Sequence, residues 1–287
     1  SSVPLTNEGA FDVGQIKQSI TSATKVVAIQ RSKGYDDRPS FTIEKIKRII
    51  MEVREVKEDV IIFVDNCYGE FVETKEPLEA GADLIAGSLI KNPGGGIARI
   101  GGYIAGRKDL IELCSYRLTA PGLGKETGAS LNSLQEMYQG IFLAPHVVGE
   151  ALKGAIFTAK FLDLLGFNTN PSFDAKRTDL IQSVNFETSD QMIRFCQAIQ
   201  QASPVNSHVL PHASPMPGYE DDVIMAAGTF IQGASLELTA DGPIRPPYTA
   251  FVQGGLTYAH VKIAVTQAVE SLIDEGIFTL DLRLSNN

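Results

Sequence analysis

The hydrophobic positions of the first 110 residues alternate between the spacing of helices and that of buried strands. After Ser40, apolar residues recur at steps of three and four up to Val56, which predicts an amphipathic helix. Asp12 can cap a shorter helix before it. Continuous apolar runs, typical of strands buried on both faces, occur at four places, residues 25–30, 59–66, 82–88 and 101–106.

Strands that alternate with helical crossovers predict an α/β fold with a mainly parallel sheet and helices on both of its sides. In such sheets, ligands bind beyond the carboxyl ends of the strands. Asp65 and Ser88 both stand at such an end in the predicted arrangement. We therefore expect them at the same edge of the sheet.

The second half of the chain has a different pattern. Residues 146–167 predict one long helix, and "NTNPS" breaks the pattern after it, with Pro171 as the terminating residue. We expect a large domain over residues 1–145, an interdomain helix over 146–170 and a small α+β domain over 171–287. Within the small domain, the pattern predicts strands at 179–186, 223–230, 234–239 and 248–253. It predicts helices after Ser189 and from Thr257.

The composition narrows the class of protein. The 287 residues carry a net charge of −9, which argues against a general nucleic-acid binder. The three cysteines are far apart and odd in number, which indicates reduced thiols in a cytoplasmic protein. We expect no membrane segment, because no uninterrupted apolar run reaches about 18 residues. Residues 1–10 also lack the features of a signal peptide.

Three side chains suggest a pyridoxal phosphate site. Asp65 ends a buried apolar strand, where a carboxylate requires a cationic partner such as a protonated pyridine nitrogen. Lys91 follows apolar neighbours in "GSLIK", and a partly desolvated lysine is suited to Schiff-base formation. The hydroxyl of Ser88, three residues earlier, can hold a phosphate. Asp65 and Lys91 are 26 residues apart, which allows one crossover and one strand between them.

Each of these residues also has an ordinary structural interpretation. Asp65 could cap a turn before Tyr68, Lys91 could be a solvated lysine at a strand end, and Ser88 could be a capping serine. Only the combination favours cofactor chemistry.

The stretches "VDNCYGEF" and "GADLIAGSLIKNPGGG" resemble pyridoxal phosphate enzymes of fold type I, the aspartate aminotransferase-like group. With "IQRSKGYDDRPS", "TAPGLGKETGAS" and "DGPIRPPYTAFVQGGLTYAH", nearly the whole chain is similar to the aluminium-resistance or methionine gamma-lyase-like family, near the cystathionine lyases. The resemblance implies a mostly parallel large domain and a small α+β C-terminal domain. It also implies an N-terminal segment with a phosphate-capping loop before the first strand found here.

The resemblance implies that Lys91 carries the cofactor as a Schiff base, that Asp65 faces the pyridine nitrogen and that Ser88 helps to hold the phosphate. The implied reaction is carbon–sulfur elimination from a sulfur-containing amino acid through an external aldimine. Transamination, aldol cleavage, decarboxylation and a non-catalytic stress-resistance role stay open. Arg245 is the candidate ligand of the substrate carboxylate, with a rim arginine as the alternative. A homodimer or homotetramer is also implied.

Other features of the sequence are weaker indications of a functional site. Gln30, Arg31 and Ser32 follow a strand end and could reach the ring or the substrate. "GLGKETG" lacks the spacing of a nucleotide-binding loop, and His208 and His212 lack further metal ligands. We expect Cys67 and Tyr68 to be core residues, and His146 to cap the long helix. The sequence thus predicts no metal site and no nucleic-acid or membrane partner.

Overall fold

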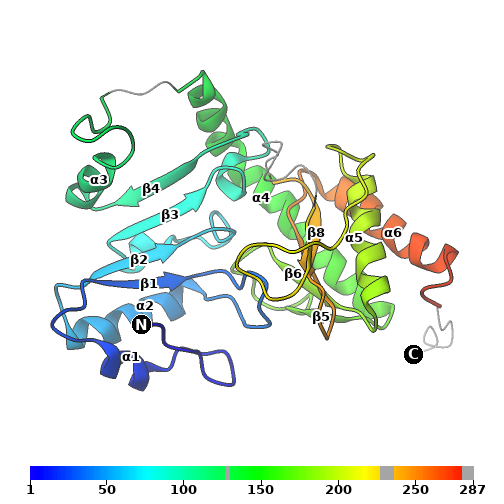
Figure 1. The fold of residues 1–287 in the computed structure, drawn as a ribbon, viewed down its shortest axis with the longest axis horizontal. Helices are drawn as coiled ribbons and strands as arrows, with labels where there is room; N and C mark the ends of the chain where they lie inside the picture. Colours follow the sequence, from blue (N-terminus) through cyan, green and yellow to red (C-terminus); the bar gives the residue numbers. More distant parts are fainter. Residues whose placement is uncertain (127–129, 227–235, 280–287) are drawn as a thin grey trace.

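The computed structural model describes residues 1–126, 130–226 and 236–279, and within them the chain forms two β-sheets that lie side by side (Figure 1). Helix α4 (Ser133–Leu164) runs from the first sheet to the second. Each sheet has its own hydrophobic core, and a smaller cluster at the middle of α4 lies between them.

The first sheet contains the four strands that the apolar runs predict. They are β1 (Val26–Gln30), β2 (Ile61–Asp65), β3 (Leu84–Ser88) and β4 (Gly102–Gly106), in that order across the sheet. The first three are parallel and β4 is antiparallel to β3, so the sheet is mainly parallel as predicted.

One face of this sheet is covered by helix α2 (Ile43–Val56), against which α1 (Val13–Ser19) packs. The predicted capping by Asp12 is confirmed, since its side chain accepts a hydrogen bond from the backbone of Gln15 at 2.9 Å. The opposite face carries Val26 and Ile104, whose side chains are 51% and 49% exposed. The prediction of helices on both faces is therefore not met in the part of the chain that the structure describes.

Helix α4 begins 13 residues before the predicted start at His146, which lies inside it. The hydrophobic pattern misplaced the start because Pro145, a residue that usually ends or begins a helix, is contained within α4. Helix α3 (Lys108–Ser115), after β4, was not predicted.

By length and composition alone, α4 is apolar enough to cross a membrane, with 39% of its most apolar window buried. The core helix of a soluble protein meets the same criterion, and α4 packs through its buried face mainly against elements of the second half of the chain. These contacts, which involve α6 (Tyr258–Asp274), the second sheet and the turn at residues 92–94, account in part for its apolar character.

The second sheet is antiparallel, with the strand order β5-β6-β9-β8-β7. Its elements are β5 (Asn168–Asn170), β6 (Gln182–Asn185), α5 (Ser189–Ala202), β7 (Val223–Ile224), β8 (Thr239–Pro243), β9 (Thr249–Gln253) and α6 (Tyr258–Asp274). The α+β character and both helices agree with the prediction. Two details differ, because β5 forms where a loop was expected and β8 starts where the predicted strand 234–239 ends. Residues 227–235 of the predicted strands lie outside the described part.

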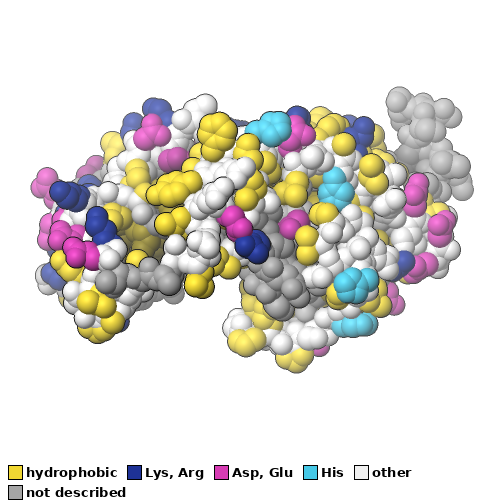
Figure 2. Space-filling view, turned by 90° about the horizontal axis from the view of Figure 1, so that it is seen from above, with side chains coloured by type: hydrophobic (Ala, Val, Ile, Leu, Met, Phe, Trp, Pro, Cys, Tyr) yellow, Lys and Arg dark blue, Asp and Glu magenta, His cyan; other side chains and the backbone are white. Residues whose placement is uncertain are grey.

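Large exposed hydrophobic side chains gather on the face shown in Figure 2, over the region of α3 and the first turns of α4. Contiguous apolar patches of this kind are typical of contact surfaces. The homodimer or homotetramer stays a prediction. The exposed residues include Leu118, Leu131, Leu134, Tyr138 and Phe142.

Candidate active site

The carboxyl ends of the parallel strands carry the first part of the site. Gln30 and Asp65 are the last residues of β1 and β2, and they lie opposite each other in the ladder. Asp65 therefore lies at the sheet edge where ligands bind in folds of this kind. One of its oxygens, Oδ1, accepts a hydrogen bond of 3.1 Å from the backbone of Cys67, which fixes the carboxylate at the start of the loop after β2.

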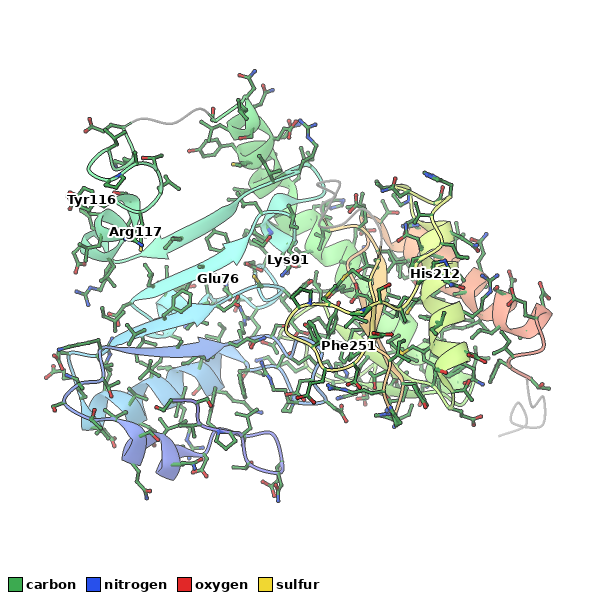
Figure 3. All side chains as sticks on the ribbon, viewed as in Figure 1. Glu76, Lys91, Tyr116, Arg117, His212 and Phe251 are labelled. Carbon is green, nitrogen blue, oxygen red and sulfur yellow. The ribbon has the colours of Figure 1, made fainter. Side chains whose placement is uncertain are left out.

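Lys91 lies beyond the end of β3, on the side that faces the second sheet (Figure 3). Its backbone donates to the carbonyl of Ser88 at 3.3 Å, so the chain turns immediately after the strand. The side chain is half-buried, and its Nζ lies 4.4 Å from the centre of the Tyr68 ring. This contact holds a cation over an aromatic face.

The glycines after Lys91 have a packing role. A Cβ on Gly95, whose φ is +56°, would collide with the carbonyl of Gly140 in α4, and a Cβ on Gly140 would collide with Gly94. The short 3-10 turn η2 (Asn92–Gly94) therefore lies with its backbone directly against α4. This contact fixes the position of Lys91 relative to the long helix.

A cavity of about 230 Å³ contains both Asp65 and Lys91. Its walls come from the loops after β1, β2 and β3 and from the second sheet, so it lies between the two sheets. The remaining residues around it are Gln30, Ser32, Gly34, Tyr35, Cys67, Tyr68, Ile181, Tyr219, Met225 and Gln253. The structure thus brings together two of the three residues on which the sequence hypothesis depends.

Ser88 does not line this cavity, and its Oγ accepts a hydrogen bond of 3.3 Å from the backbone of Ile90. The capping role that was the alternative interpretation is therefore present, and the phosphate role stays a prediction.

Arg245 is not brought to the cavity. It lies in the turn between β8 and β9, is 52% exposed, and pairs with Asp221 at 3.3 Å. Two prolines follow it in the chain, Pro246 and Pro247. Its role toward a substrate carboxylate therefore stays a prediction with no contact to support it.

Tyr68 and Cys67 were expected to be core residues, but both line the cavity. Tyr68 has a φ of +67°, a left-handed conformation that is unfavourable for a bulky side chain and that often marks functional sites. Burial raises the pKa of the Cys67 thiol to about 11, so it is neutral at physiological pH. Cys67 is thus a small neutral wall residue of the cavity.

The three polar residues after β1 have different positions. Gln30 and Ser32 line the cavity, whereas Arg31 is fully buried beside Glu73 and Glu76. The next residue, Lys33, is also buried, and burial lowers its pKa. Arg31 and Lys33 therefore belong to the packing between the two sheets.

Sequence patterns did not predict the wall that the second sheet contributes to the cavity. Tyr35 lines the cavity, and its hydroxyl donates a hydrogen bond of 2.6 Å to Asp241 of β8. Asp241 is 1% exposed, and burial raises its pKa to about 7. Asp241 lies outside the strands that the hydrophobic pattern predicts, and the resemblance did not single it out.

The residues present fit the ring end of pyridoxal phosphate. A carboxylate, a primary amine and an aromatic side chain share one small cavity, and these are the groups that would face a ring nitrogen, a ring aldehyde and a ring surface. The described residues around the cavity fit the phosphate less completely, since they offer hydroxyls and one lysine.

The structure tests some of the weaker sequence signals. Among the described residues, no group of three or more His, Cys, Asp or Glu side chains could hold a metal ion. His208 and His212 are exposed. The "GLGKETG" segment falls partly on residues 127–129, which lie outside the described part.

The chain is similar to several known proteins. It is 65% identical over 277 residues to the protein YnbB of Bacillus subtilis, covering 96% of this chain and 66% of YnbB. A solved structure from Listeria innocua, named as a candidate cystathionine beta-lyase involved in aluminium resistance, is 66% identical with a TM-score of 0.90, covering 94% of this chain and 66% of that one. The chain thus spans about two thirds of the length of these relatives.

More distant likeness concerns the fold alone. The structure of metB from Corynebacterium glutamicum has a TM-score of 0.59 at 17% identity, covering 91% of this chain and 66% of that one. This likeness agrees with the predicted fold class, that of the fold type I pyridoxal phosphate enzymes.

The sequence model of the methionine gamma-lyase family matches residues 1–273. The chain therefore belongs to the methionine gamma-lyase family.

Proposed function

We propose that this protein is a pyridoxal phosphate-dependent carbon–sulfur lyase that acts on a sulfur-containing amino acid by elimination. The observation that carries the proposal is that Asp65 and Lys91 line the same cavity beyond the parallel strands. The family match and the similarity to the Listeria protein support the same class of reaction. When bound, pyridoxal phosphate supplies an electron sink for the negative charge that develops at the substrate Cα.

Asp65 would keep a proton on the ring nitrogen. Its carboxylate is fixed by the hydrogen bond from the backbone of Cys67 and stands at the strand end that faces the cavity. An ionic partner at that position favours the protonated nitrogen, which strengthens the ring as an electron acceptor.

Lys91 would bind the cofactor covalently through Nζ before the substrate arrives, and then act as the base at Cα. The half-buried side chain lies over the ring of Tyr68, so Nζ is positioned in the cavity where it would accept the Cα proton. The proton from Cα would move to this nitrogen.

The second sheet would hold the sulfur substituent. Ile181, Tyr219 and Met225 give the cavity an apolar and aromatic wall opposite the charged groups. Such a wall suits a thioether side chain better than a charged one. The same geometry does not exclude other reactions of the cofactor, so the reaction must be decided by product analysis.

The test is to supply L-cystathionine, S-ethyl-L-cysteine and L-methionine with pyridoxal phosphate and to measure released thiol and keto acid together. We expect equal amounts of both from at least one substrate. Lys91→Ala should lower the rate by at least about 10²–10⁴-fold. Lys108→Ala, a change of an exposed lysine at the start of α3, is the matched control and should keep the wild-type rate.

Keto acid without thiol would refute elimination in favour of transamination or another reaction. Borohydride reduction followed by peptide mass analysis tests the attachment independently. A pyridoxyl group on a lysine other than Lys91 would refute the assigned role of Lys91.

A further inference from the structure

We propose that Lys33 and Arg177 form a binding site for a small oxyanion in a second cavity, which shares no lining residue with the cavity of Asp65 and Lys91. The inference is independent of the proposed elimination. Phosphate, sulfate and carboxylates share the chemistry that this site would recognise, namely oxygen atoms that carry negative charge and accept hydrogen bonds.

The second cavity lies where the loop after β1 meets the segment between β5 and β6. Its volume is about 90 Å³, which suits a small ion, whereas pockets for larger organic ligands typically measure about 300–1,000 Å³. Among the described residues that line it, three side chains are cationic and one is acidic, so the local charge favours an anion. The lining residues are Lys33, Pro39, Ser40, Asn170, Pro171, Lys176, Arg177, Thr178 and Asp179.

Lys33 supplies a buried cation whose hydrogen-bond partners are neutral. Its side chain is 4% exposed, and Nζ donates to the carbonyl of Asn170 at 3.2 Å and to the hydroxyl of Ser183 at 3.1 Å. An ammonium group has three donor hydrogens, so one is left for a ligand. Burial lowers the pKa of Lys33, and the carboxylates of Asp179 and Asp37 oppose this effect only in part. A bound oxyanion would supply the missing negative charge.

Arg177 supplies donors that the described part of the chain leaves without acceptors. Its Nη2 donates to the side chain of Gln182 at 2.6 Å, but Nε and Nη1 are buried and have no hydrogen-bond partner there. Burial also lowers the pKa of this guanidinium to about 10. A buried charged donor without an acceptor is costly, and an oxyanion in the second cavity would satisfy it.

The carboxylate of Asp179 does not take the place of the anion. Its Oδ2 accepts hydrogen bonds from the hydroxyls of Ser32, at 2.9 Å, and Ser40. Within the described ranges, no ion pair of 4.0 Å or less joins Asp179 to Lys33 or Arg177. The serine hydroxyls therefore hold this carboxylate, and the two cations keep donors for a ligand.

The test follows the thermal unfolding midpoint while sodium chloride is replaced by sodium phosphate at constant ionic strength. An anion held by Lys33 and Arg177 joins the loop after β1 to the segment before β6, so it should stabilise the fold. For a site with a dissociation constant of about 1 mM, the midpoint should rise by roughly 2 °C at about 10 mM phosphate. Sodium acetate is titrated in parallel, and the tighter of the two ligands identifies the class of oxyanion.

The variants locate the site. Arg177→Gln and Lys33→Met should each weaken phosphate binding by at least about tenfold, because each removes a charge-assisted hydrogen bond. Lys108→Met and Arg99→Gln are the matched controls, since they remove the same charge from exposed side chains and should keep the wild-type affinity. Unchanged affinity in Arg177→Gln, or no saturable rise with either oxyanion in the wild type, would overturn the proposal.

The titration is repeated after the protein has been loaded with pyridoxal phosphate and freed of the excess. The rise should be the same, because the two cavities have different lining residues. A rise that disappears on loading would assign the phosphate to the cofactor cavity and would contradict the second site.

A further readout uses the wild-type protein and does not require the variants to be stable. In protein labelled with ¹⁵N-arginine, the Nε–H signal of Arg177, identified by its absence from Arg177→Lys, should shift saturably with phosphate. The dissociation constant from this shift should match that from the unfolding midpoint. An Arg177 signal that stays constant would refute the site even if phosphate stabilises the protein.

Discussion

Replacement of Arg31 by methionine tests whether the packing between the two sheets depends on one buried cation. Arg31 is 0% exposed, and its guanidinium donates to Asn66 at 2.8 Å, to Glu73 at 3.2 Å and to Glu76 at 3.3 Å. Its Nη2 also lies 3.4 Å from the hydroxyl of Thr178, which follows α4 and β5 in the chain. Methionine keeps the apolar stem and removes the charge.

The loss of stability comes from the carboxylates that lose Arg31 as a partner. Removal of one partner of a buried ion pair typically costs about 3–5 kcal/mol, because the other charge is left uncompensated. The Glu73 side chain is only 9% exposed, but it keeps its ion pair with the exposed Lys176 at 3.0 Å, so we expect the lower end of this range, about 3 kcal/mol. Glu76 is 31% exposed and adds little. With an unfolding entropy of roughly 0.6 kcal/mol/K for a chain of this length, the midpoint should fall by about 5 °C.

The effect should depend on pH. Burial of Glu73 opposes its charge, but hydrogen bonds from Ile43, Lys176 and Thr178, together with Arg31, outweigh burial and lower its pKa below 4.5. A carboxyl with a lowered pKa adds stability that is present above its unfolded pKa and is lost as pH falls. The loss caused by Arg31→Met should therefore be smaller at pH 4 than at pH 7.5.

The assay is thermal unfolding followed by circular dichroism at both pH values. Arg245→Met is the matched control, because it removes an arginine–aspartate pair that is exposed on both sides and is worth at most about 1 kcal/mol. Equal shifts of the midpoint in the two variants, or a shift below about 2 °C for Arg31→Met, would refute the argument from burial.

Three further changes have defined outcomes. Gly87→Ala should destabilise the fold by about 1–3 kcal/mol in urea unfolding, because the new Cβ would meet the Glu70 carboxylate and lie 2.5 Å from the Tyr103 ring, whereas Gly149→Ala, with no atom within 4 Å, should be neutral or stabilising. Burial raises the pKa of Glu70 to about 8, so its contribution to stability is full below pH 4.5 and is lost as pH rises through 8. The urea midpoint of Glu70→Gln should consequently rise relative to wild type between pH 5 and pH 8, and a constant difference would contradict this. Thr257→Ala removes the cap of α6 and should cost about 0.5–2 kcal/mol by urea unfolding.

The first sheet could be predicted because its residues follow local rules. Its strands are short continuous apolar runs, and Asp65 stands at a position that the parallel arrangement fixes. Since the carboxyl ends of parallel strands meet at one edge, the distance along the sequence between Asp65 and Lys91 was enough to place them near each other.

The second sheet was harder to predict because its local signals conflict with its structure. The hydrophobic pattern placed the start of the long helix at His146, but α4 begins at Ser133 and contains Pro145. "NTNPS" suggested only a loop, but three of its residues pair with β6. Strand β8 has the sequence Thr-Ala-Asp-Gly-Pro, and its strand conformation depends on pairing with β9 and β7 rather than on intrinsic preference.

The position of the cavity between two sheets explains why sequence patterns could not predict half of the site. Asp65 and Lys91 come from adjacent crossovers of one sheet, so spacing along the chain reports their proximity. Tyr35 and Asp241 are 206 residues apart and meet only because two sheets pack against each other. The same packing would divide the chemistry between the two sheets, since the loops of the first sheet supply the groups that would act on the cofactor and on Cα, and the second sheet supplies part of the wall that would hold the sulfur substituent. Substitutions in the second sheet should therefore change which leaving group is accepted before they change cofactor binding.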